Sequence, residues 1–292
     1  MVVFPEMARA GSMMKSNKNK TSVQRFLIIL LIVAVILAGG LVFISYYFKI
    51  SQQKESAQAL SAAKVGLEKA LESNPTEEIS INIGQITVKV KPQEQGGKRL
   101  FDFGGLKFVS DELPNVWLIG HTAQGELNPS ESFPANGKIT ICWGDSSQVG
   151  AATPPTLEVS LIYKDGANYK VIRAGFDPKA GRTVGFEGAD DSGGGNCGNL
   201  AFAKNIDLAS GTFTLPQKAV PYLLRLKLLY NSEAQPLAVS ADNNLPNQGK
   251  CFDSTATITE SKITRKIRQC QFFEAPPALF DYVLFSGGSL TK

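Results

Sequence analysis

The chain has 292 residues, which is enough for one or two domains with a substantial buried core. Apolar residues make up 43% and charged residues 19%, a composition that excludes a disordered acidic tail, a collagen and a disulfide-only miniprotein. The 30 Lys and Arg against 26 Asp and Glu leave a formal charge of +4, too weak and dispersed to favour nucleic acid as a partner.

The first element in chain order is an apolar run, FLIILLIVAVILAGGLVFISYYF, over residues 26–48. A helix rises about 1.5 Å per residue, so this run matches the ~30 Å hydrocarbon core of a bilayer, whereas the apolar region of a signal peptide has only ~7–15 residues. We therefore predict a transmembrane helix over 26–48, with the lipid bilayer as a partner.

The flanking charges predict the orientation of this helix in the membrane. Five Lys or Arg precede the run between residues 9 and 25, and only Lys49 and Lys54 follow closely. By the positive-inside rule, residues 1–25 form a short cytoplasmic N-terminus and the remainder is extracytoplasmic. The predicted location is that of a single-pass membrane protein with an exported C-terminal domain at the cell surface or in the periplasm.

Residues 49–74 continue as an amphipathic helix. Apolar residues recur at intervals of three and four, at Ala57, Leu60, Ala63, Leu67 and Leu71. A second stripe consists of small residues that suit close packing against a sheet or another helix: Ala59, Ala62, Gly66 and Ala70. Pro75 is expected to end the helix. A plain stalk with no packing role is the open alternative.

Residues 75–292 are expected to form one mostly antiparallel, sandwich-like β domain, so that the fold class is α+β. The period changes after Pro75, and alternation over Ile79–Lys91 predicts a strand or hairpin. Further strands are predicted at Asn115–Gly120, Lys138–Trp143, Thr156–Tyr163, Tyr169–Ala174, Ala201–Ile206, Tyr222–Tyr230, Ala256–Thr259, Ile263–Arg268 and Asp281–Phe285.

All four cysteines lie in this β-rich part: Cys142, Cys197, Cys251 and Cys270. An even number without any C-x-x-C spacing favours two disulfides over a zinc site. Three pairings are possible. We favour Cys251 with Cys270, across neighbouring strands, and therefore Cys142 with Cys197.

No catalytic, cofactor or metal site is predicted, and no small-molecule substrate is identified. His121 is the only histidine, and no G-x-S-x-G element is present, so the interpretation as an exported hydrolase depends on His121 alone. Asp190-Asp191 could bind calcium but is more typical of a solvated loop. The aromatic residues Trp117, Trp143, Tyr163 and Tyr169 could line a carbohydrate platform, although alternating aromatics in strands are more often core.

One segment, ESAQALSAAKVGLEKALE at Glu55–Glu72, resembles PilX-type minor pilins and related pilin-like proteins. The matching positions are Ala59, Leu60, Ala62, Ala63, Gly66, Leu67, Glu68, Ala70 and Leu71. STATITESKITRKIR at Ser254–Arg268 and PALFDYVLFSGG at Pro277–Gly288 are similar to edge and closing strands of such proteins.

This resemblance implies a non-enzymatic structural or assembly role in a type IV pilus or pseudopilus-related system. The N-terminal helix would pack with other pilin-like subunits or the assembly platform, and a disulfide-stapled β-rich head would be presented. KTSVQRFLIILL lacks the glycine before the apolar run and the glutamate within it that prepilins carry, which argues against processing by prepilin peptidase. The alternative function is a membrane-tethered binding or adhesion module for cell wall or glycan, outside any filament.

Overall fold

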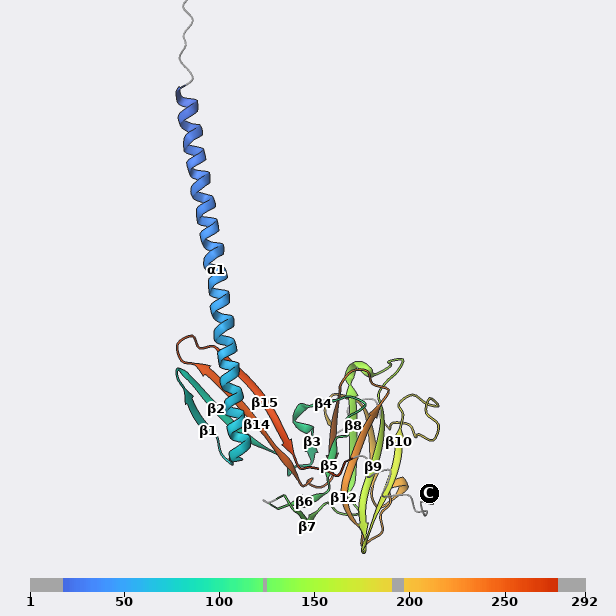
Figure 1. Cartoon of the computed structure of the whole chain (residues 1–292). Helices are drawn as coiled ribbons and strands as arrows, with labels where there is room; N and C mark the ends of the chain where they lie inside the picture. Colours follow the sequence, from blue (N-terminus) through green and yellow to red (C-terminus); the bar gives the residue numbers. More distant parts are fainter. Residues whose placement is uncertain (1–17, 123–124, 191–196, 278–292) are drawn as a thin grey trace, which may run out of the picture.

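The computed structural model describes residues 18–122, 125–190 and 197–277, with the backbone alone described at 18–29, 33–34, 37–38, 41–42 and 44. One helix, α1 (Lys18–Ser73), runs for 56 residues without interruption and projects as a rod from the β-rich part (Figure 1). Asn74 adopts a left-handed φ of 42° and its N–H donates to Ala70 O at 2.8 Å, which terminates the last turn. Pro75 then prevents continuation, so the predicted helix end is confirmed.

The structure corrects the predicted membrane span. In the ranges described above, no helix is both long and apolar enough to cross a membrane. The transmembrane helix over 26–48 is therefore contradicted, as is the single-pass location that was inferred from it.

The second half of α1 lies on a four-stranded antiparallel sheet, which we call the helix-bearing sheet. Its strands, in the order β1-β2-β14-β15, are β1 (Ile79–Ile83), β2 (Ile86–Gly96), β14 (Asn247–Ile258) and β15 (Thr264–Phe272). The central strands β2 and β14 pair along nearly their whole length although residues 97–246 separate them in sequence. Those residues form a second unit, which we call the head.

The head contains two sheets and a short hairpin. The first sheet has the order β10-β9-β12-β5, with β5 (Asn115–Trp117), β9 (Thr156–Asp165), β10 (Asn168–Phe176) and β12 (Val220–Leu229). The second has the order β11-β8-β13-β3, with β4 also on β13; its strands are β3 (Leu100–Phe101), β4 (Lys107–Phe108), β8 (Lys138–Asp145), β11 (Leu200–Asp207) and β13 (Gln235–Ala241). The hairpin pairs β6 (Ile119–His121) with β7 (Leu127–Ser132).

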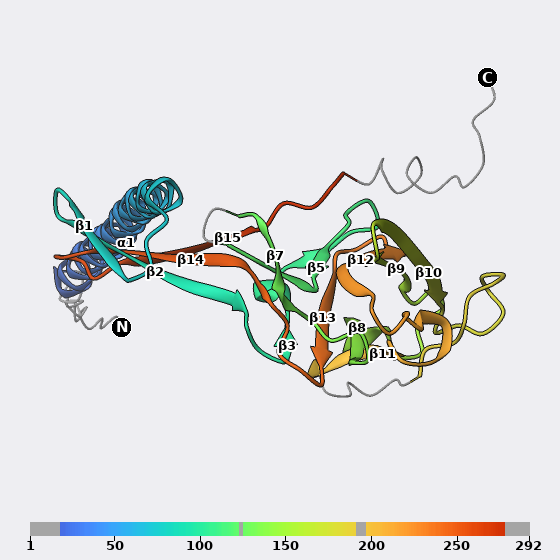
Figure 2. The same ribbon diagram turned by 90° about the horizontal axis from the view of Figure 1, so that it is seen from below.

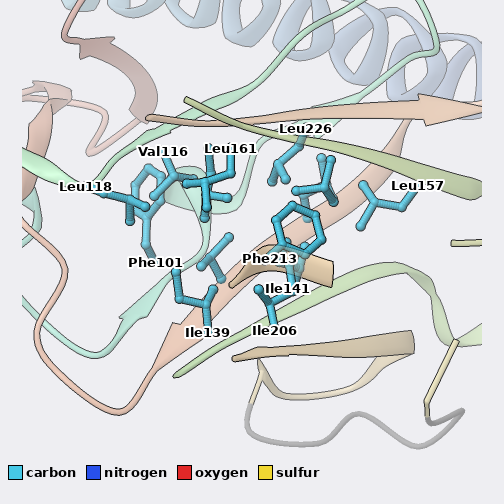
Figure 3. Close-up of a cluster of buried hydrophobic side chains, with 14 of the residues drawn as sticks. Phe101, Val116, Leu118, Ile139, Ile141, Leu157, Leu161, Ile206, Phe213 and Leu226 are labelled. Atoms are coloured by element: carbon cyan, nitrogen blue, oxygen red, sulfur yellow. The ribbon is translucent and has the colours of Figure 1, made fainter. Parts of the chain in front are cut away.

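Side chains from both sheets of the head meet in one apolar core (Figure 3). Along β9 the inward positions Leu157, Val159 and Leu161 are fully buried, as alternation in a half-covered strand requires. Trp143 is fully buried from the opposite sheet, and its indole Nε1–H donates to Pro155 O at 2.8 Å. The head is therefore a β-sandwich.

An ion pair fixes the loop after β10. Asp177 is 3% exposed and accepts from Arg182 at 2.9 Å (Nε) and 2.7 Å (Nη2) and from the Thr183 hydroxyl at 2.7 Å. Burial alone would raise the pKa of Asp177, but these bonds and the Lys179 N–H outweigh it and lower the pKa to about 2. Arg182 also donates to Pro154 O at 2.9 Å, which ties this loop to the start of β9.

Strands were predicted at the positions of β1, β2, β5, β6, β8 to β12, β14 and β15, and each of these is present. The predicted strand Asp281–Phe285 lies outside the described residues. Strands β3, β4, β7 and β13 were not predicted. Within the β-rich part expected over 75–292, the head is inserted between β2 and β14 of the helix-bearing sheet.

Candidate assembly surface on helix α1

The part of α1 before the sheet exposes large apolar side chains. Between Leu30 and Ile50 the described ones are each 45–66% exposed: Leu30, Leu31, Ile32, Val35, Ile36, Phe43, Tyr46, Tyr47, Phe48 and Ile50. We call residues 18–50 the projecting part of α1. Folded chains rarely leave a continuous apolar surface of this kind uncovered unless it binds something.

The following turns of α1 bury small side chains against the helix-bearing sheet. The buried positions recur every three or four residues, and together we call them the docking face: Ala59, Ala62, Ala63, Gly66, Leu67 and Ala70. They pack on Val88, Val90, Phe252, Ala256 and Ile258 of the sheet. The structure thus favours packing on a sheet over the plain stalk.

Two residues of the predicted apolar stripe lie elsewhere. Leu60 is 37% exposed and Ala57 is exposed, while Leu71 is only half-buried at the edge of the interface. The stripe that lies on the sheet is the small-residue one, rotated from the stripe that includes Leu60 and Leu71. Small side chains are selected here because they let the helix backbone approach the sheet closely.

Gly66 shows how close that approach is. A Cβ atom at this position would lie 2.4 Å from Val88 Cγ1, 3.2 Å from Ser254 Oγ and 3.3 Å from Val90 Cγ2. By contrast, a Cβ at Gly39 or Gly40 in the projecting part would meet nothing within 4 Å. Glycine at position 66 is therefore required by packing against the sheet.

Polar contacts fix the helix on the sheet. The buried Ser254 hydroxyl donates to Ala63 O at 2.7 Å, directly beneath the docking face. At the edge strand β15, Arg265 Nε donates to the Ser56 hydroxyl at 2.8 Å. These bonds define one axial position of α1 on the sheet.

The cysteines pair as favoured from sequence. Cys251 and Cys270 face each other in the register of β14 and β15, with Cα atoms 3.9 Å apart. Cys142 on β8 joins Cys197 at a Cα–Cα distance of 6.1 Å. The first disulfide joins the edge strand β15 to its neighbour β14 within the helix-bearing sheet, and the second lies in the head.

The head is joined to the helix-bearing sheet by a buried amide. Gln248 of β14 is 1% exposed; its Oε1 accepts from Trp117 N at 2.7 Å and its Nε2 donates to Trp117 O at 2.8 Å. Nearby, Arg268 donates to both carboxylate oxygens of Asp253 and to Gly104 O of the head. These contacts fix the head relative to α1.

The outer face of the helix-bearing sheet is polar. The hydrogen bonds from Arg268 hold the pKa of Asp253 below its ordinary value, against the opposing effect of burial. Lys266 lies 3.5 Å from the same carboxylate, and Lys89 lies 3.8 Å from Glu78. Three cations of this face, Lys89, Lys266 and Arg268, thus each have an acidic partner.

A cavity of about 490 Å³ opens beside α1, between the docking face and the ends of β1, β2 and β14. Its lining includes two acidic residues, Glu55 and Glu260, and three isoleucines, Ile83, Ile86 and Ile258. It borders the boundary between the projecting part and the docking face.

The aromatic residues singled out from sequence do not form one platform. Trp143, Trp117 and Tyr163 are 0%, 6% and 8% exposed respectively, whereas Tyr169 is 54% exposed. Trp117 Nε1 donates to Phe273 O at 3.3 Å, so its polar edge is occupied.

His121 lies at the end of β6, stacked on Phe273 at a ring-centroid distance of 4.1 Å. Desolvation lowers the pKa of His121 below its ordinary value. Asp190 accepts from Lys204 Nζ at 2.9 Å and from Asn205 N at 2.8 Å, while Asp191 lies outside the described residues. Across the described part of the chain, no group of three or more His, Cys, Asp or Glu is placed to hold a metal ion.

Comparison with models of protein families, with curated protein sequences and with solved structures yields no match to this chain.

Proposed function

We propose that this protein is a non-enzymatic, pilin-like structural or assembly subunit of PilX type, acting in a type IV pilus or pseudopilus-related system. The observation that carries the proposal is the division of α1 into two parts. The docking face is buried against the chain's own sheet, whereas the apolar side chains of the projecting part are exposed and can contact other molecules.

The partner we propose for the projecting part is the apolar helix of another copy or of a related subunit. Fully burying one such side chain contributes about 1.5–3 kcal/mol. Several together exceed the roughly 4–15 kcal/mol that association costs in lost freedom of motion. A straight rod of this length can contact more than one neighbour along its axis.

The arrangement of the other parts supports the same proposal. Close packing at Gly66, the Ser254 hydrogen bond and the Gln248 bridge hold the head in one orientation relative to the rod. A subunit built this way presents its head at a defined place once its helix is packed. The adhesion alternative lacks comparable support, because Trp117 and Trp143 are buried.

The test compares two substitutions in α1. Ile36, which is 66% exposed, is replaced in Ile36→Asp, and the exposed polar Gln52 is replaced in the matched control Gln52→Asp. We expect the wild type and the control to be recovered with sheared surface filaments or the assembly platform, and Ile36→Asp to be lost from both. Both variants should retain the two disulfides, because both side chains are exposed.

Two results would contradict the proposal. One is recovery of Ile36→Asp at the wild-type level. The other is wild-type protein that is never recovered with filaments or platform and is unchanged when the pilus genes are deleted.

A further inference from the structure

The head has a second apolar surface that the assembly proposal does not use. It is the outer face of the sheet β10-β9-β12-β5, on the side away from the sandwich core. The strand register places one apolar row across this face: Trp117, Leu223, Ile162 and Val171. The neighbouring row is polar and contains two arginines: Asn115, Arg225, Ser160 and Arg173.

Residues at the centre of this face are buried even though they point away from the core. Leu223 is 1% exposed, Arg225 is 3% exposed and Ser160 is 5% exposed. Phe273 and Ala275, which follow β15, pack on the apolar cluster around Leu223. Part of the cover is therefore the chain itself.

The chain reaches this face just where the described residues end. Arg225 Nη2 donates to Pro276 O, and the last described residue is Pro277. Figure 2 shows the segment after β15 leaving the helix-bearing sheet and running alongside the head. The described chain therefore ends next to β12, the strand that carries Arg225.

The sequence that follows is complementary to the two rows. Residues 278–285 read ALFDYVLF, an apolar segment interrupted by one acid, Asp281, and no other Asp or Glu occurs up to Lys292. We propose that the outer face of this sheet is the docking site for the chain's own C-terminal segment, with apolar side chains on the Trp117–Val171 row and the Asp281 carboxylate against Arg225 and Arg173.

The distances allow this arrangement. Five extended residues from Pro276 to Asp281 reach about 16–17 Å. Arg225 on β12 and Arg173 on β10 are separated by one strand, or roughly 10 Å. A carboxylate that accepts charge-assisted hydrogen bonds from a guanidinium stabilises a cation held out of water.

The experiment measures access to the face in the isolated full chain, kept in mild detergent, and so does not depend on assembly into a filament. Ile162→Cys places a reporter thiol on the apolar row, and Leu100→Cys, 45% exposed on the other sheet, is the control. The rate of modification by a thiol reagent is compared between the full chain and a chain ending at Pro277. We expect the rate at position 162 to rise at least tenfold on truncation and the rate at position 100 to stay unchanged.

Two conservative substitutions in the full chain test the same proposal in case the truncated chain does not fold. In the full chain, Asp281→Asn should also raise the rate at position 162, while Glu274→Gln, an exposed acid before the face, should not. Mapping of both native disulfides confirms the fold in each case. Equal rates with and without residues 278–292, or a rate unaffected by Asp281→Asn, would overturn the proposal. Protection that disappears on dilution would also overturn it, because the occupant would then be the C-terminus of a second copy.

Discussion

Replacing Gly66 tests whether the closest contact between α1 and the helix-bearing sheet holds the two together. In Gly66→Ala the new Cβ would lie 2.4 Å from Val88 Cγ1, so the helix or the valine must shift. Overpacking of this kind destabilises the folded state by about 1–3 kcal/mol, and the better helix propensity of alanine stabilises it by about 0.5–1 kcal/mol. The difference spans about 0–2.5 kcal/mol, and because a contact of 2.4 Å requires a real shift, we expect a net destabilisation of the interface of about 1–2 kcal/mol.

The assay is amide hydrogen exchange over residues 59–70 in the full chain. A loss of about 1–2 kcal/mol corresponds to exchange faster by about 5- to 30-fold through opening of the helix from the sheet. Gly39→Ala is the matched control, because its Cβ meets nothing within 4 Å in the same helix. We expect the control to leave exchange at 59–70 unchanged. If Gly66→Ala exchanges at the wild-type rate or more slowly, the close approach of α1 to the sheet is refuted.

Three further predictions address the remaining contacts. Replacing Cys251 and Cys270 by serine removes a link across 19 residues, which should lower the free energy of unfolding by about 3 kcal/mol in denaturant titration; a loss below about 1 kcal/mol would contradict this. The pKa of Asp177 is lowered from 3.8 to about 2, so its contribution of roughly 2 kcal/mol is present above pH 4 and lost as the pH falls towards 2. Asp177→Asn should therefore be less stable at neutral pH and lose less stability on acidification; parallel pH profiles would show the reasoning wrong. Gln248→Ala leaves Trp117 N and O without their buried partner and should cost about 1–3 kcal/mol in thermal or chemical unfolding, and an unchanged transition would argue against a fixed junction.

Local patterns in the sequence predicted the elements that local physics determines. The end of α1 follows from Pro75, and the strands from alternation, as in β9 and β12. The pairing of Cys251 with Cys270 was favoured because a short loop brings neighbouring strands together, and the structure confirms it. Strand β13 was missed because Pro236 interrupts a short segment, and proline within a strand pattern argues against a strand.

Long-range pairing was outside the reach of such patterns. Adjacent strands β2 and β14 are separated by the whole head, and nothing in either strand specifies its partner. The orientation of Leu60 was wrong for a related reason. A rule that buries the larger apolar side chain places Leu60 inwards, whereas the closest approach to the sheet, at Val88, is made by Gly66, which has no side chain.

For the candidate surface, the small-residue stripe was recognisable before the structure, since Ala59, Ala62, Gly66 and Ala70 lie on one side of a helix. The sequence did not show which element packs on this stripe, because small residues allow close packing against a sheet as well as against a second helix. The predicted span over 26–48 was contradicted by the described helix. The closed face around Arg225 had no signal in sequence, because it depends on four strands in register.

Photo-crosslinking from position 36 tests the central claim, that the projecting part of α1 packs with helices of other subunits. A photoreactive amino acid replaces Ile36 in the full chain, the cells that make the protein are irradiated, and the adduct is identified by mass. We expect a covalent adduct with the apolar helix of another copy or of a pilin-like subunit. The absence of any adduct with such a helix, while the protein is present and its disulfides are formed, would contradict it.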